Sequence, residues 1–158
     1  MTLYHGSYLA VEMPNISYSR EKVDFGKGFY TTQIKEQAVR WSARFKRKKG
    51  QCVVSLYEID KSELLNNSKI LSFETYSDEW LDFILDCRRG NDTSDYDVVI
   101  GGVANDKVFD TIELFFEKLI DRAEAIERLR YESPNLQYCF RSQDIIDRYL
   151  KFVSSEEV

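Results

Sequence analysis

Histidine and cysteine are scarce in this chain of 158 residues, and each scarcity excludes a class of protein. A single histidine argues against a zinc site built on histidine ligands. The three cysteines, Cys52, Cys87 and Cys139, are widely spaced in apolar stretches. This pattern is typical of buried, reduced thiols and not of a disulfide framework or a CxxC metal site. We therefore expect a cytoplasmic protein that binds no metal.

Long apolar runs and a basic charge balance are also lacking. No window approaches the ~20 apolar residues of a membrane span, and residues 1–13 lack the pattern of a signal peptide. The net charge of −5 argues against bulk electrostatic binding to nucleic acid. The basic run at 44–49 ends a predicted helix, where cations suit the helix dipole, although a phosphate-facing or partner-facing patch is the alternative. The length indicates one domain, residues 1–158.

Hydrophobic periodicity and turn residues predict strands and helices in mixed order. Strands are predicted at 2–5, 29–32, 52–59, 69–73, 96–100, 136–140 and 151–153. Helices are predicted at 34–48, 60–67, 78–89, 108–132 and 143–150, the fourth with a break near residue 121. We expect Gly6-Ser7 to end the first strand, Gly101-Gly102 to end the fifth, and Thr31 or Thr32 to cap the first helix. The absence of a regular βαβ repeat favours an α+β fold.

Common catalytic and nucleotide-binding motifs are absent. Gly26-Lys27-Gly28 precedes a strand instead of opening a helix after one, so a Rossmann fingerprint is excluded by its context. There is no P-loop, no GxSxG and no HExxH. Asn105 and Asp106 follow the Gly-Gly pair, where they either cap the next helix or contact a ligand.

Three segments, considered together, indicate a family. They are residues 4–7 (YHGS), residues 25–32 (FGKGFYTT) with Ala38 and Trp41 on the next helix, and residues 136–140 (LQYCF). In this order they resemble the ADP-ribosyltransferase superfamily, in the His–Tyr–Glu branch shared by diphtheria-like toxins and poly(ADP-ribose) polymerases. The resemblance covers most of the chain and is closest to small stand-alone bacterial domains of unknown function. It implies split mixed or antiparallel sheets with flanking helices, and NAD as co-substrate.

The resemblance implies a role for each matching residue. His5 would hydrogen-bond the ribose next to nicotinamide, and Gly6 would offer its backbone to the nicotinamide amide. Tyr30 would stack on the nicotinamide ring. Gly28, in the turn before Tyr30, and Thr31, beside the pocket, complete the expected NAD-binding residues.

Gln137 occupies the position where the polymerases carry glutamate. A glutamine can hydrogen-bond a hydroxyl, but it has no charge and cannot act as a base. The expected catalytic set is therefore His5, Tyr30 and Gln137. Asp24, Asp106 and Glu132 are further acidic residues that would supply a base.

The resemblance implies an NAD-dependent mono-ADP-ribosyltransferase that acts on a protein or nucleic-acid acceptor and releases nicotinamide. Small bacterial relatives often act as toxins, in toxin–antitoxin or phage-defence systems, so an antitoxin protein is an expected partner. The alternative is a catalytically weak module that binds NAD or ADP-ribose and regulates a partner. An RNA 2′-phosphotransferase would need several Arg and His residues to hold a phosphate, and the single histidine argues against it.

Overall fold

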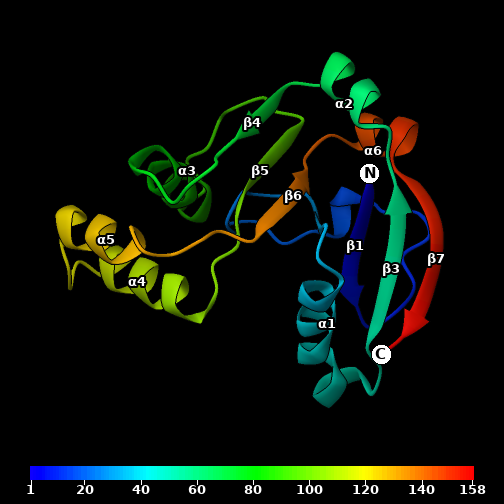
Figure 1. Cartoon of the computed structure of the whole chain (residues 1–158), viewed down its shortest axis with the longest axis horizontal. Helices are drawn as coiled ribbons and strands as arrows, with labels where there is room; N and C mark the ends of the chain where they lie inside the picture. The colour runs from blue at the N-terminus through cyan, green and yellow to red at the C-terminus, as the bar shows by residue number, and fades with distance from the viewer.

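The computed structural model describes residues 1–158 as an α+β protein with one seven-stranded mixed sheet and six α-helices (Figure 1). The strands are β1 (Thr2–Ser7), β2 (Phe29–Thr32), β3 (Val53–Glu58), β4 (Ile70–Ser72), β5 (Val98–Gly102), β6 (Leu136–Phe140) and β7 (Lys151–Glu157). The helices are α1 (Lys35–Lys49), α2 (Lys61–Asn67), α3 (Asp78–Arg89), α4 (Asp106–Phe116), α5 (Arg122–Leu129) and α6 (Gln143–Tyr149), and a 3-10 turn, η1, covers Ile16–Tyr18. The predicted α+β class is confirmed.

The sheet has the order β4-β5-β6-β2-β1-β3-β7, in which only β4 and β5 run parallel. Strand β2 pairs with β6 along its whole length, whereas it meets β1 at a single registered position, Tyr4 opposite Thr32. In Figure 1 the strands β4, β5 and β6 run obliquely to β1, β3 and β7. The sheet is therefore continuous but nearly divided between β2 and β1.

Each face of the sheet carries its own hydrophobic core. Helices α3, α4 and α5 bury one cluster, in which Trp80, Ile84 and Ile112 are fully enclosed. A second cluster is centred on Tyr57 and Phe140. Successive residues of a strand point to opposite faces, so the neighbours Cys139 and Phe140 of β6 belong to different clusters.

Helix ends follow the polar residues and glycines of the sequence. Ser77 and Asn105 accept hydrogen bonds from backbone N–H groups of α3 and α4, so the predicted cap of α3 is confirmed and Asn105 acts as a cap. Gly50 and Gly90 end α1 and α3 in the left-handed conformation. The predicted break near residue 121 is also found, since α4 ends at Phe116 and α5 begins at Arg122.

Several predictions about where elements end or are capped were wrong. Strand β1 runs through Gly6-Ser7, and β5 runs through Gly101-Gly102. The glycines are needed within these strands because helix backbone or aromatic rings occupy the places where their Cβ atoms would lie. Neither threonine caps helix α1, whose N-cap residue is Ile34 and has no side-chain cap. The Thr32 hydroxyl instead accepts a hydrogen bond from the Ile34 N–H (3.1 Å), before the helix begins. Strand β7 extends to Glu157, well past residue 153.

Two other expectations concern the cysteines and the basic run. All three cysteines are free and buried, as predicted. The cations of the basic run include Lys46, Arg47, Lys48 and Lys49 in the last turn of α1, where the helix dipole favours them. None of the helices has the length and apolar character needed to cross a membrane.

Candidate functional site

His5 lies at the point where the sheet divides. It follows Tyr4, the last residue of β1 that is registered with β2. Its Nδ1 donates a hydrogen bond to the backbone oxygen of Tyr30 (2.7 Å), and its ring packs against Phe29 with the ring centres 4.4 Å apart. A carbonyl oxygen can only accept, so the proton of a neutral His5 ring sits on Nδ1. Nε2 is then left as a hydrogen-bond acceptor.

The surroundings of His5 keep its ring neutral at physiological pH. Burial lowers the pKa of His5 from 6.5 to about 4. The hydrogen bond to the Tyr30 carbonyl acts in the opposite direction, and the positive charge of Arg44 lowers the pKa further. The unprotonated Nε2 of this neutral imidazole can accept a hydrogen bond from a hydroxyl, such as one on a ribose.

Gly6 and Gly28 are both placed where a side chain does not fit. A Cβ on Gly6 would overlap the backbone oxygen of Ala38, so α1 packs directly on the strand. A Cβ on Gly28 would lie 2.5 Å from the sulfur of Cys139 and 2.7 Å from the Phe140 oxygen. Close packing therefore explains both glycines, and their contact with NAD stays a prediction.

Tyr30 is anchored through its hydroxyl to the turn that precedes β2. The hydroxyl donates to the Gly26 oxygen (2.6 Å) and accepts from the Phe25 N–H (3.0 Å). Burial raises the pKa of Tyr30, so the phenol stays protonated. Thr31 is fully buried, and its hydroxyl donates to the backbone oxygen of Tyr138 (3.3 Å). In this conformation Thr31 offers nothing to a ligand.

Gln137 is buried between two strands without a partner for its amide nitrogen. It lies on β6 opposite Thr32 of β2 and Gly101 of β5. Only 4% of the residue is exposed, and its Nε2 makes no hydrogen bond. Most buried polar atoms in native proteins are hydrogen-bonded, so this amide is a donor that still needs an acceptor.

The three expected catalytic residues occupy adjacent or next-adjacent strands but do not share one face. Tyr30 is opposite Cys139, two residues beyond Gln137 on β6, so the side chains of Tyr30 and Gln137 point to the same face. His5 packs against Phe29, which precedes Tyr30 and therefore belongs to the other face. The contact between His5 and Tyr30 thus runs through the Tyr30 backbone.

The further acidic residues form no hydrogen bond or ion pair with these side chains. Asp24 is engaged by Arg88, whose Nη2 lies 2.8 Å from its Oδ1. Glu132 lines a small polar hollow with Lys107 and Arg128, and Asp106 is exposed in the first turn of α4.

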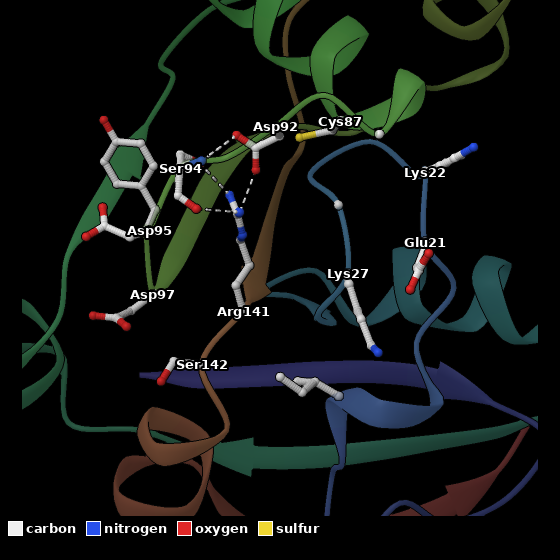
Figure 2. A pocket seen from close by; sticks show the side chains of 14 residues that line it. Glu21, Lys22, Lys27, Cys87, Asp92, Ser94, Asp95, Asp97, Arg141 and Ser142 are labelled. Carbon is white, nitrogen blue, oxygen red and sulfur yellow. Dashed lines mark hydrogen bonds and ion pairs between the residues drawn. The ribbon is translucent and has the colours of Figure 1, made fainter.

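A pocket of about 620 Å³ lies at the other end of β6 from Gln137, beyond Phe140 (Figure 2). Arg141, the residue after β6, forms an ion pair with Asp92 (2.6 Å), and it also donates to the Ser94 hydroxyl (3.1 Å). Sequence reasoning missed these residues because 49 positions separate Arg141 from Asp92 and no local pattern links them. Gly26 lines this pocket, and its backbone oxygen also accepts the hydrogen bond from the Tyr30 hydroxyl. The His5, Tyr30 and Gln137 side chains do not line it.

The fold and the geometry at the sheet division define a small α+β protein with a neutral histidine held across its central strands. By its sequence, the chain belongs to a protein family of unknown function, DUF3990, whose model matches residues 1–152. No curated protein and no solved structure matches it. Membership of such a family agrees with the resemblance to small bacterial domains of unknown function, and it leaves the activity to be argued from the residues.

Proposed function

We propose that this protein is an NAD-dependent mono-ADP-ribosyltransferase whose site lies at the division between β1 and β2. The observation that carries the proposal is the hydrogen bond from His5 Nδ1 to the Tyr30 oxygen. This bond fixes the tautomer, so Nε2 accepts a hydrogen bond from a ribose hydroxyl of NAD. Because His5 is neutral, it adds no positive charge beside a sugar that becomes cationic in the transition state.

The reaction breaks the bond between the nicotinamide nitrogen and C1′ of the ribose. Nicotinamide leaves with the bonding electrons and becomes neutral, while an oxygen or nitrogen atom of the acceptor bonds to C1′ and loses its proton to water. Fixed dipoles around the ribose stabilise the oxocarbenium-like transition state. The Tyr30 ring is the aromatic surface for nicotinamide. The ring lies on the opposite face from His5 and its hydroxyl is anchored to Gly26 and Phe25, so the proposal requires this anchor to open and the side chain to reorient when NAD binds.

Gln137 limits what this site performs. Its carboxamide can donate to a ribose hydroxyl, but it cannot take the proton of the acceptor. Asp24, the nearest of the acidic candidates in sequence to Tyr30, is bound to Arg88. The proposal is therefore the transfer of a single ADP-ribose unit to an acceptor that needs no strong base, and not chain elongation.

The second candidate function is a binding module that holds NAD or ADP-ribose and regulates a partner without turnover. The uncharged, buried Gln137 favours it. The two functions differ in one product, because only the enzyme releases nicotinamide from NAD.

The proposed setting is the bacterial cytoplasm, where the protein acts as a toxin of a toxin–antitoxin or phage-defence system and is held inactive by an antitoxin protein. This setting rests on the resemblance. The acceptor is a protein or a nucleic acid. The basic last turn of α1, Lys46 to Lys49, is the surface that would guide a nucleic acid.

Incubation of the purified protein with adenine-labelled NAD and a bacterial lysate tests this proposal. We expect label on a macromolecule, with the mass of one ADP-ribose unit added. The proposal predicts that a His5→Gln variant loses this label, whereas a Tyr131→Phe variant, which changes a 78% exposed tyrosine, keeps it. If the His5→Gln variant labels the acceptor as strongly as the wild type, the assigned site is wrong. If the wild type binds NAD tightly but releases no nicotinamide from it, the binding module is favoured.

A further inference from the structure

A second glutamine, Gln37, shares the unusual state of Gln137. It lies in the first turn of α1, where only 3% of the residue is exposed. Its Nε2 is buried and has no hydrogen-bond partner. The resemblance assigns Gln37 no role, and no contact within the protein explains why an amide is kept there.

Gln37 and Gln137 lie on two elements that both adjoin the end of β2. Thr32 is opposite Gln137 in the sheet, and the chain passes from Thr32 into α1, which begins at Lys35. Gln37 belongs to the buried face of α1, next to Ala38, whose backbone oxygen packs on Gly6 of β1. Gln37 thus belongs to the helix that follows β2, and Gln137 belongs to β6, the strand that pairs with β2.

A buried amide without a partner is costly. Each unsatisfied donor loses its hydrogen bonds to water without replacement and so disfavours the folded state, whereas an apolar side chain of the same shape carries no such penalty. Two such donors beside the division of the sheet are explained if the protein uses them when a ligand brings oxygen acceptors. The indole nitrogen of Trp80 also has no hydrogen-bond partner, but Trp80 lies in the hydrophobic core under α3, α4 and α5.

We infer that Gln37 is a further ligand-binding residue, which donates with Gln137 to oxygen atoms of the ADP-ribose part of NAD. This inference rests on the proposed function. The acceptors in this part of NAD are ribose hydroxyl and phosphate oxygens, and a neutral carboxamide binds either one without adding charge to the site. Gln37 is therefore expected to set affinity for ADP-ribose more than the rate of nicotinamide release at saturation.

The test uses the Gln37→Met variant, because methionine has nearly the same volume and no donor. ADP-ribose, which cannot turn over, is titrated calorimetrically into the wild type and the variant, and thermal unfolding of both is measured without ligand. We expect the variant to bind at least tenfold more weakly and to unfold at a higher temperature. Gln51→Met, at an exposed position, is the matched control and should change neither quantity.

The outcomes separate this inference from the proposed function. If the variant binds ADP-ribose as tightly as the wild type, or unfolds at a lower temperature, Gln37 has an internal role and the inference is wrong while the function stands. If the wild type binds neither ADP-ribose nor NAD, the proposed function fails, and the role of Gln37 fails with it.

Discussion

Protonation of His5 is expected to destabilise the fold in a defined pH range. Its pKa is about 4 in the folded protein and 6.5 without the protein environment, so the unfolded chain binds more protons between these values. The stability that a neutral His5 contributes is complete above pH 6.5 and is lost as the pH falls towards 4. Between pH 7.5 and 4.5 the shift corresponds to at most about 2.5 kcal/mol. Because His5 is only partly buried, we expect about 1–2 kcal/mol.

The assay is urea unfolding of the wild type and of a His5→Gln variant across this pH range. Glutamine can still donate to the Tyr30 oxygen but does not titrate, so the difference between the two proteins removes the contribution of the carboxylates. The wild type should lose stability relative to the variant as the pH falls. A difference that stays constant from pH 7.5 to 4.5 would refute the neutral state of the partly buried His5 ring.

Three further substitutions probe the site. Gly6→Ala should destabilise the protein by roughly 3 kcal/mol in denaturant unfolding, because the new Cβ overlaps the Ala38 oxygen; an unchanged midpoint would contradict the packing of α1 on β1. Tyr30→Phe should cost about 1–2 kcal/mol and make the turn at Gly26 exchange amide hydrogens faster, since both bonds of the hydroxyl are lost. Gln137→Glu should grow less stable relative to the wild type as the pH rises from 4 to about 7, because burial raises the carboxyl pKa; a pH-independent difference would mean that solvent reaches this position.

Local signals in the sequence were enough to predict most helices and strands. Side-chain caps and left-handed glycines mark helix ends by bonds within a few residues, which is why Ser77 and Gly90 were recognised in advance. The predictions at Gly6 and Gly101 were wrong because a glycine in a strand pattern usually indicates a break. Both glycines are required here because a helix backbone or an aromatic ring from a distant segment occupies the space of a Cβ atom. The full length of β7 could not be predicted because its second half is rich in serine and glutamate and has no apolar pattern. This edge strand is held mainly by its pairing with β3.

The candidate site was predictable only in part. The proximity of His5 to Tyr30 followed from the resemblance, but the contact through the Tyr30 backbone and the resulting tautomer required the strand register. Gln37 gives no signal in the sequence, because a glutamine in a helix is usually solvated and its burial depends on how closely α1 packs on Gly6. The pair of Arg141 and Asp92 likewise depends on tertiary structure.

Nicotinamide release from NAD by the purified protein, compared with the His5→Gln variant at pH 7.5, tests the central claim most directly. The variant keeps a donor for the Tyr30 oxygen but lacks the acceptor that Nε2 provides at the same place. We predict release by the wild type and a loss of at least a hundredfold in the variant, which is the range expected when one pre-set hydrogen bond to the transition state is removed. No release by the wild type in the presence of lysate, or equal release by both proteins, would contradict the account.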